Sequence, residues 1–325
     1  MPYQDEPVLV LIPVFNDWEA ARQVVSALDR LPAAGRCSIL LIDDGSTDRV
    51  PEGFTQNARH LQSVSILRLC RNLGHQRAIA IGLTEAPRFN PVAVVVMDGD
   101  GEDCPEHVTL LLDAWHRQPG RIVFAERRKR MESVTFRTLY HGYRLLHWLL
   151  TGISVRVGNF SVVPAGALPA LAACPDLWNH YAAAVFRLRW PTATVPLDRG
   201  RRYAGQSKMN FAALCVHGLS AISVFADLAG ARLMAMALLL LPVALAVAWL
   251  WPAAAWGALL AAVLLCGQAA AFLLQTVSAR SQMNFLPVRD AGFFVASITT
   301  EYQRPSLHGL EQRQEWLASP TPASN

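Results

Sequence analysis

The fold of this chain is decided by the stretch Val94-Val95-Val96-Met97-Asp98-Gly99-Asp100-Gly101-Glu102-Asp103. An apolar run ends abruptly in carboxylates spaced by glycines, which is typical of a buried strand leading into a ligand-binding turn. Alternate carboxylates at that edge of a sheet suit a hard divalent cation, and such a cation binds a diphosphate. A solvated acidic loop is the alternative. A strand as apolar as this one is buried, however, and its end favours Asp98, Asp100 and Glu102 as metal ligands.

Other apolar runs predict a sheet around this strand. Strands are expected at residues 8–14, 37–42, 64–69, 92–97 and 121–125, with weaker candidates at 159–163, 193–195 and 293–298. Helical periodicity predicts helices at 17–31, 74–86 and 105–115. Strands and helices that alternate at this spacing are typical of a mostly parallel sheet with helices on both faces, so the expected fold class is α/β.

Composition narrows the functional class. The 325-residue chain has a net charge of +4, which gives no reason to expect a nucleic-acid partner. The first residues are polar and the next apolar run is only as long as a strand, so no signal peptide is expected. The 6 cysteines show no C-x-x-C spacing, which indicates reduced core residues in a cytoplasmic catalytic domain.

Two uncharged apolar stretches, at about 233–251 and 254–277, are each long enough to cross a bilayer as a helix. Arg232 and Arg280 flank their outer ends, so a multi-pass hairpin in the inner (plasma) membrane is expected, with both ends cytoplasmic. A hairpin buried in a soluble core is the alternative. Small residues on the second span offer a face for a homo-oligomer; they are Ala261, Ala262, Gly267 and Ala271.

These features predict four segments. They are a catalytic domain at 1–207, a juxtamembrane amphipathic helix at 208–231, the hairpin at 232–278 and a cytoplasmic tail at 279–325. A long helix is expected at 209–228. An earlier helix from 135 to 150 combines an aromatic-rich apolar stripe with a basic stripe, which favours an interfacial helix; a core-packing helix with a solvated back is the alternative.

Two further groups of residues suggest ligand contacts. In Asp43-Asp44-Gly45-Ser46-Thr47-Asp48 the first carboxylates suit a base or ribose, and the last three residues suit a helix cap. Basic residues suit either substrate phosphates or anionic lipids. They are Arg127, Arg128, Lys129, Arg130 and Arg137, followed by Arg199, Arg201, Arg202 and Lys208.

The motifs together resemble a known family. Pro13-x-Phe15-Asn16-Asp17 and Asp43-Asp44-Gly45-Ser46-x-Asp48 are similar to the start of family 2 glycosyltransferases with the GT-A fold. Arg71-Asn72-x-Gly74, Asp98-x-Asp100-x-Glu102-Asp103-x-Pro105 and Arg202-x-x-Gly205-x-Ser207-Lys208 resemble motifs of polyprenyl-phosphate glycosyltransferases. The resemblance covers residues 8–277. It implies a GT-A nucleotide-diphospho-sugar transferase fold with a C-terminal two-helix transmembrane hairpin.

The resemblance also implies roles for particular residues. The nucleotide-sugar would be held by Pro13, Phe15, Asp17, Ile42, Asp44, Asp98, Gly99, Asp100, Arg127, Arg202 and Lys208. The acceptor phosphate would be held by Arg127, Arg130, Ser133, Arg137, Arg202 and Lys208. Asp98, Asp100 and Glu102 would hold Mg²⁺ or Mn²⁺, with Asp98 and Asp100 as the catalytic residues.

The implied activity is inverting transfer of a sugar from a UDP- or GDP-sugar to polyprenyl phosphate (undecaprenyl or dolichyl) at the membrane. Three departures from the family pattern stand out, since Glu102 replaces Gln, Asp17 replaces Glu, and Asn159 replaces Asp or Ser. Two alternatives stay open. One is an enzyme of the same fold with another membrane acceptor, either a lipid or a lipid-linked glycan. The other is a nucleotide-sugar-binding membrane scaffold without turnover.

Overall fold

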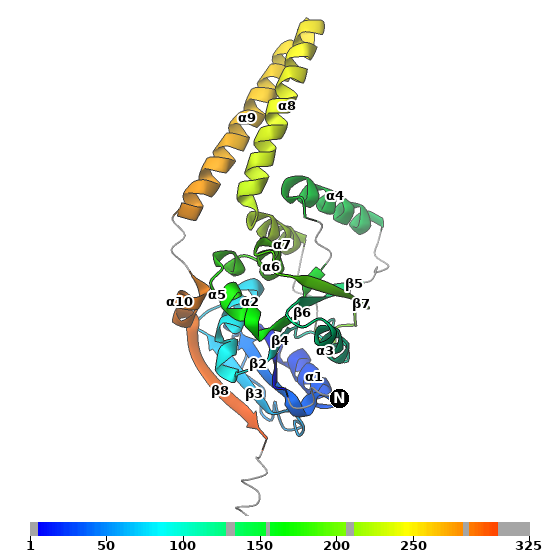
Figure 1. Ribbon diagram of the computed structural model, residues 1–325, viewed down its shortest axis with the longest axis vertical. Coiled ribbons are helices and arrows are strands. Elements are labelled where there is room, and N and C mark those ends of the chain that lie inside the picture. Colours follow the sequence, from blue (N-terminus) through cyan, green and yellow to red (C-terminus); the bar gives the residue numbers. More distant parts are fainter. Residues whose placement is uncertain (1–5, 128–133, 154–156, 206–210, 282–285, 305–325) are drawn as a thin grey trace, which may run out of the picture.

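The computed structural model describes residues 6–127, 134–153, 157–205, 211–281 and 286–304. Its centre is one eight-stranded sheet with the order β7-β5-β6-β4-β1-β2-β3-β8 (Figure 1). The strands are β1 (Val8–Val14), β2 (Cys37–Asp43), β3 (Ser63–Leu69), β4 (Ala93–Val96), β5 (Ile122–Arg127), β6 (Val157–Pro164), β7 (Thr192–Leu197) and β8 (Val295–Gln303).

The sheet is mostly parallel, as the sequence predicts. Strands β4, β1, β2 and β3 run parallel to one another, and β5 runs parallel to β7. Strand β6 runs antiparallel to both β4 and β5, and β8 closes the far edge antiparallel to β3. The ends of β1, β2 and β4 therefore meet at one edge, where ligands bind in open α/β sheets.

Helices cover both faces of the sheet (Figure 1). α1 (Trp18–Asp29) and α3 (His107–Arg117) pack on one face, and α2 (His75–Glu85), α5 (Leu168–Ala172) and α6 (Tyr181–Arg187) pack on the other. Along β1, Val10 and Ile12 enter the first core and Leu9 and Leu11 enter the second. Because both faces of this strand are buried, its sequence is continuously apolar.

The remaining long helices are α4 (Val134–Thr151), α7 (Phe211–Ser223), α8 (Ala226–Leu250) and α9 (Pro252–Ser281), and a short helix, α10 (Pro287–Asp290), precedes β8. The expected single helix at 209–228 is wrong, because the chain turns by 88° between α7 and α8. At the turn, Val224 and Phe225 are buried with Ala183 of α6 and Ala221 of α7. Burial of these side chains against α6 stabilises the bend, which a local periodicity does not reveal.

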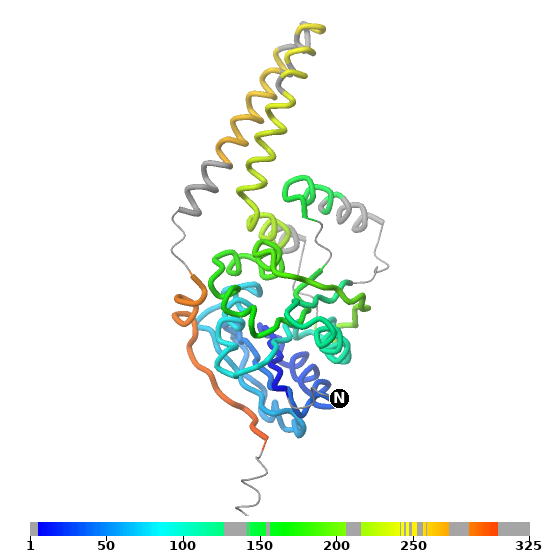
Figure 2. The backbone as a smooth tube through the Cα atoms, in the orientation of Figure 1, coloured from blue at the N-terminus to red at the C-terminus, as the bar shows by residue number. Residues whose placement is uncertain are grey.

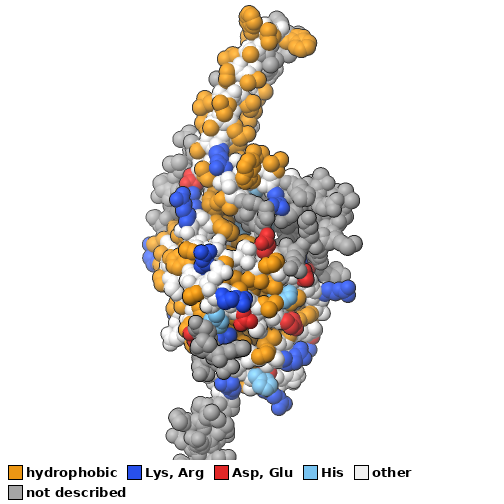
Figure 3. Space-filling model, turned by 45° about the vertical axis from the view of Figure 1, so that its right-hand side comes forward, with side chains coloured by type: hydrophobic (Ala, Val, Ile, Leu, Met, Phe, Trp, Pro, Cys, Tyr) orange, Lys and Arg blue, Asp and Glu red, His pale blue; other side chains and the backbone are white. Residues whose placement is uncertain are grey.

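Helices α8 and α9 pack side by side as a hairpin that projects from the sheet domain (Figure 2). Apolar side chains gather along the hairpin (Figure 3), and Leu239, Trp249 and Trp256 are 72%, 81% and 81% exposed. The alternative of a hairpin buried in a soluble core is therefore wrong. In the described part of the chain, no single helix is long and apolar enough to cross a membrane; Val216–Ser223 and Ala226–Leu240 reach that length and composition only as a bent pair.

Candidate active site

The acidic turn after β4 is held in shape by its own carboxylates. Oδ2 of Asp103 accepts the backbone N–H of Asp98 at 3.0 Å, and Oδ1 of Asp100 accepts the backbone N–H of Glu102 at 2.9 Å. A Cβ atom at Gly99 would lie 2.9 Å from Cγ2 of Ile12, so a larger residue would displace β1 from the turn. The glycine thus lets the turn lie directly against the end of β1.

A second segment, the strap formed by residues 199–203, lies on this acidic turn. The backbone N–H groups of Gly200 and Tyr203 donate to the carbonyl oxygens of Glu102 and Asp100 at 2.8 and 2.9 Å. The Tyr203 ring fills the space above Gly101, where a Cβ atom would lie 2.7 Å from its Cγ. Gly101 also has a φ of +89°, which glycine adopts without strain.

Arginines of the strap pair with the predicted metal ligands. Nη1 of Arg202 lies 2.9 Å from Oδ2 of Asp100, and Nη2 of the same side chain contacts the carboxylate of Asp17. Arg199 contacts the carboxylate of Glu102. Two guanidinium groups therefore supply positive charge to carboxylates from the ends of β1 and β4.

The donor set has the chemistry that a hard cation requires, since Asp98, Asp100 and Glu102 supply carboxylate oxygens from one turn. Within the described ranges, however, no three His, Cys, Asp or Glu side chains are arranged to hold a metal ion. Asp100 and Glu102 are instead engaged by Arg202 and Arg199. The carboxylates fit Mg²⁺ or Mn²⁺ by chemistry, and they would have to leave these arginines to converge on it.

The turn after β2 is also built by carboxylates. Asp43 is fully buried, where it accepts the N–H of Ser46 at 2.8 Å and pairs with Nε of Arg68 at 2.9 Å. Asp44 accepts the N–H groups of Leu73 and Gly74 at 2.7 and 2.9 Å. Burial raises the pKa of Asp44 despite these two donors. Asp44 thereby positions the turn that starts α2.

The expected helix cap at Ser46, Thr47 and Asp48 is wrong. In the described chain no helix follows these residues before β3. The hydroxyl of Ser46 accepts the backbone N–H of Asn16 at 2.9 Å, and that of Thr47 accepts its side-chain amide at 3.0 Å. These polar residues join the turns after β1 and β2, so they support the strand ends at the site.

His75, the first residue of α2, also belongs to the site, although no sequence motif pointed to it. Its Nε2 lies 3.1 Å from Oδ1 of Asp98 and 3.0 Å from Nδ2 of Asn159. Burial lowers the pKa of His75, but the carboxylates of Asp98, Asp103 and Asp44 outweigh it and raise the pKa above its usual value. His75 therefore connects α2 and β6 to the acidic turn.

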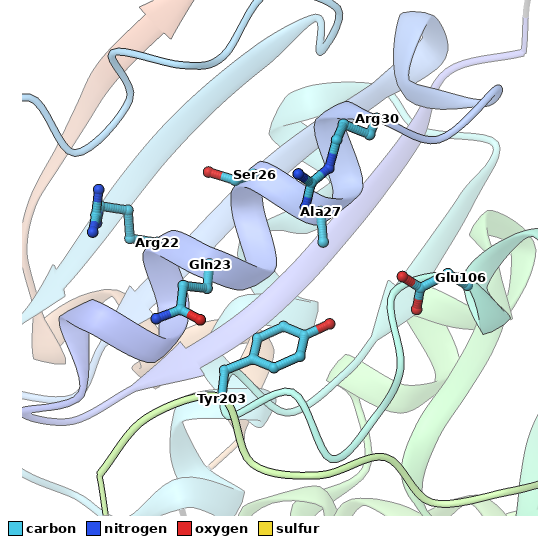
Figure 4. A pocket seen from close by; sticks show the side chains of 7 residues that line it. All are labelled: Arg22, Gln23, Ser26, Ala27, Arg30, Glu106 and Tyr203. Carbon is cyan, nitrogen blue, oxygen red and sulfur yellow. The ribbon is translucent and has the colours of Figure 1, made fainter.

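A shallow cavity of about 370 Å³ adjoins the strap (Figure 4). Tyr203 forms one side of it and Glu106 another, and the rest comes from α1, including Arg22, and from Arg30 directly after that helix. The same tyrosine ring covers Gly101, so Tyr203 lies both against the acidic turn and in the wall of the cavity.

Comparison with known proteins identifies the fold and the family. Residues 9–168 match the model for Glycosyl transferase family 2. This part of the chain is a family 2 glycosyltransferase domain. Glucosyl-3-phosphoglycerate synthase from Mycobacterium tuberculosis, solved with Mn²⁺, UDP-glucose and phosphoglyceric acid, superposes with a TM-score of 0.51 at 16% identity over 70% of this chain and 81% of that one. That similarity confirms the GT-A-like fold of the glycosyltransferase.

Relatives in sequence include proteins that are named as glycosyltransferases. An uncharacterized glycosyltransferase of Bacillus subtilis is 28% identical over 216 residues, which is 63% of this chain and 64% of that protein. One from Synechocystis sp. is 25% identical over 222 residues, covering 66% and 68%. The undecaprenyl-phosphate 4-deoxy-4-formamido-L-arabinose transferase of Pectobacterium carotovorum is 32% identical over 138 residues, covering 41% and 40%. The chain thus spans less than two thirds of the Bacillus protein and less than half of the arabinose transferase.

The structure places many of the expected donor-site residues together. Asp17, Asp98, Asp100 and Arg202 lie at the shared strand edge, and Phe15 is 37% exposed at the end of β1. The side chains of Pro13 and Ile42, which were expected to contact the nucleotide-sugar, are buried in the sheet.

The expected acceptor residues are mostly not described. Arg130, Ser133 and Lys208 lie outside the described residues, as do Arg128 and Lys129. Arg127 ends β5 and Arg137 lies in α4, but their side chains are outside the described part. Sequence reasoning missed His75, Asn16 and the pairing of Arg199, because each depends on contacts between distant segments.

Proposed function

We propose that this glycosyltransferase transfers a sugar, with inversion, from a UDP- or GDP-sugar to polyprenyl phosphate at the inner membrane. The observation that carries the proposal is that the guanidinium of Arg202 contacts the carboxylates of Asp17 and Asp100 at the carboxyl edge of the sheet. Carboxylates suited to a cation and a guanidinium suited to phosphate lie there side by side. That combination matches the two parts of a metal-bound diphosphate.

The donor would bind across the ends of β1, β2 and β4. The exposed ring of Phe15 would stack on a base, and Asp17, which Arg202 contacts, would bind a ribose hydroxyl. Asp98, Asp100 and Glu102 would hold Mg²⁺ or Mn²⁺, which would neutralise charge on the leaving diphosphate. Support for a divalent ion comes from the M. tuberculosis synthase solved with Mn²⁺ and UDP-glucose.

The reaction forms a bond between an oxygen of the acceptor phosphate and the anomeric carbon. The bond from that carbon to the diphosphate oxygen breaks, and its electron pair leaves with the nucleoside diphosphate. A phosphate monoester is ionised at neutral pH, so the chain need not provide a strong base. Its side chains would orient the two substrates and stabilise charge, with Arg202 on a phosphate and with Arg127, Arg130, Ser133, Arg137 and Lys208 assigned to the acceptor.

Membrane placement of the acceptor is supported by the exposed apolar surface of α8 and α9 and of α4. On α4, Leu145 and Trp148 are 58% and 53% exposed. Such exposure is costly in water and favourable in lipid. The undecaprenyl-phosphate specificity named for the Pectobacterium relative further supports a polyprenyl acceptor.

The test is a reconstituted assay with the full chain in detergent. A panel of UDP- and GDP-sugars is supplied with Mn²⁺ or Mg²⁺ and undecaprenyl phosphate, and the lipid product is analysed by mass spectrometry. An acid-labile lipid phosphate sugar, formed only with cation and lipid phosphate, supports the proposal. A stable glycoside on another extracted lipid would assign a different acceptor, and donor binding without turnover across the panel would indicate a scaffold.

A further inference from the structure

A second cavity, of about 350 Å³, lies where α4 meets the base of α8. It is lined by Trp148, Leu149, Gly152 and Arg232. In Figure 1, α4 lies beside the end of α8 that is nearer the sheet domain, and the two helices are in contact. The cavity is therefore at the level where the apolar hairpin leaves the sheet domain.

The guanidinium of Arg232 closes one side of this cavity and holds the end of α4. Its Nη1 donates to the carbonyl oxygens of Trp148 and Leu149, each at 3.3 Å, in the last turn of the helix. Its Nη2 lies next to Gly152, where a Cβ atom would be 2.5 Å away. The carbonyls at a helix C-terminus carry only partial negative charge, so they offset only part of the charge of the arginine. Within the described residues, Nε and Nη2 make no hydrogen bond.

The surrounding helices supply no carboxylate to balance Arg232. Helices α4, α7 and α9 contain no Asp or Glu, and Asp227 is the only acidic residue of α8. Asp227 is bound by Arg187 of α6 at 2.6 and 3.2 Å. In the described part of the chain, the charge of Arg232 thus has no acidic partner, and an anion from outside the chain would balance it.

The side chains around the guanidinium indicate what kind of anion fits. Trp148 and Leu149 line the cavity and are exposed, and the exposed Leu145 lies one turn before Leu149 on α4. A ligand of this site therefore needs a charged group for Arg232 and hydrocarbon for its neighbours. A membrane phospholipid combines the two, because a guanidinium matches phosphate oxygens and tryptophan is favourable at the membrane–water interface.

We propose that the cavity between α4 and α8 binds an anionic membrane phospholipid, with Arg232 on the lipid phosphate and with Trp148 and Leu149 beside the glycerol and the start of the acyl chains. The inference rests on the membrane placement in the proposed function. The bound phosphate is not the one that reacts, since α8 packs chiefly against α4, α7 and α9, none of which carries a residue of the acidic turn. The lipid would hold α4 against α8 and fix the depth at which the hairpin enters the bilayer.

Lipid binding to the full chain in detergent tests this site. The chain is stripped of lipid and titrated with phosphatidylglycerol or with diacylglycerol, which has the same tails but no phosphate, and bound lipid is counted by native mass spectrometry. We expect Arg232→Leu to weaken binding of the first phosphatidylglycerol about 10- to 100-fold, the range for hydrogen bonds to a charged group, and to leave diacylglycerol within about threefold of wild type. Arg117→Leu, at an exposed arginine that ends α3, is the matched control and should bind both lipids like wild type.

The Gly152→Asn variant tests the cavity without removing the charge. Gly152 has a φ of +74°, a conformation that Asn adopts more readily than other residues with a side chain. Its Cβ atom would displace the guanidinium and its amide would fill the cavity, so we expect the same selective loss of phosphatidylglycerol. Thermal unfolding midpoints establish that each variant is folded. Wild-type affinity for phosphatidylglycerol in either variant overturns the inference. An equal loss of both lipids in Arg232→Leu also overturns it, because Arg232 would then only hold α4 in place.

Titration with undecaprenyl phosphate, with sugar turnover measured alongside, separates this inference from the proposed function. A loss in Arg232→Leu that is confined to undecaprenyl phosphate would assign the cavity to the acceptor and overturn the inference. Absence of turnover in wild type, together with a selective loss of phosphatidylglycerol in Arg232→Leu, would refute the proposed function and support the phospholipid site. Turnover in wild type with unchanged phosphatidylglycerol binding in Arg232→Leu would refute the phospholipid site alone.

Discussion

The guanidinium of Arg202 lies 2.9 Å from the carboxylate of Asp100, although 102 residues separate them in the chain. The same guanidinium contacts Asp17 at the end of β1, and neighbouring Arg199 contacts Glu102. Arginine side chains of the chain itself therefore place positive charge beside the acidic turn. A cation that binds these carboxylates has to displace arginines, and the displaced guanidinium of Arg202 is then available to a phosphate.

Replacement of Arg202 by Met should affect metal and donor binding in opposite directions. Loss of a competing positive charge should tighten binding of Mn²⁺ alone by about 3- to 10-fold. Loss of the phosphate contact should lower kcat/KM for the sugar donor by about 100-fold or more. Electron paramagnetic resonance measures free Mn²⁺, and nucleotide release measures turnover. Arg202→Lys, which keeps the charge, is the matched control; weaker Mn²⁺ binding by Arg202→Met would contradict the expected competition.

The Asp100→Asn substitution should abolish turnover and weaken Mn²⁺ binding by at least about 10-fold, because a carboxylate ligand becomes a neutral amide. The fold should persist, since the amide oxygen can still accept the N–H of Glu102. Nucleotide release and Mn²⁺ titration check this outcome. Asp113→Asn on the exposed side of α3 serves as the control and should leave both unchanged. Full activity in Asp100→Asn would remove Asp100 from the metal site.

The burial of His180 predicts that the free energy of unfolding depends on pH. Its ring is 6% exposed, caps α6 by accepting the N–H of Ala183 at 3.3 Å, and lies 4.7 Å from the ring of His217. Burial, with smaller effects from His217 and His147, lowers the pKa of His180 to about 3. In the unfolded chain the imidazole of His180 takes up a proton near pH 6.5, whereas in the folded chain it stays neutral at that pH. The free energy of unfolding should therefore decrease as the pH falls below 6.5, by about 2 kcal/mol between pH 6.5 and 5.

The His180→Asn variant keeps a capping acceptor and removes the titrating group. Its free energy of unfolding should lose this component of the pH dependence, while His107→Gln should keep the wild-type profile. Chemical denaturation in detergent at pH 5, 6 and 7 provides the comparison. Parallel profiles for wild type and His180→Asn would show that His180 does not stay neutral in the fold.

Insertion of the α8–α9 hairpin into a membrane can be tested at Leu239, whose side chain is 72% exposed on α8. An Arg at a lipid-facing position costs about 2.5 to 3.5 kcal/mol at the middle of a membrane helix, so Leu239→Arg should reduce the carbonate-resistant membrane fraction. Leu110→Arg, at a 47% exposed position of α3, is the matched control and should not change it. Equal membrane retention by both variants would contradict insertion of α8.

The strands and the acidic turn could be predicted from local sequence alone. A strand buried on both faces has to be continuously apolar, and a turn that lies against a neighbouring strand needs glycine, as at Gly99. The sheet strands therefore lie within a few residues of their expected positions. The order of the motifs along the chain also indicated the family, because each motif follows a strand that ends at the carboxyl edge of the sheet.

Other features depend on packing between distant segments. The break between α7 and α8 exists because Val224 and Phe225 bury themselves against α6, and no periodicity within 209–228 records that contact. Ser46 and Thr47 hold Asn16 rather than cap a helix, because β1 and β2 lie next to each other and end together.

The sequence by itself determined the sheet, the acidic turn and the chemical types of side chain available to a diphosphate. The tertiary structure decided which of them pair. Arg202 reaches Asp17 and Asp100 because the strap crosses the ends of β1 and β4, and His75 reaches Asp98 because Asp44 at the end of β2 fixes the turn at Gly74 that starts α2. Residue type and periodicity are local properties, whereas these pairings are set by strand order and register, which only the folded chain defines.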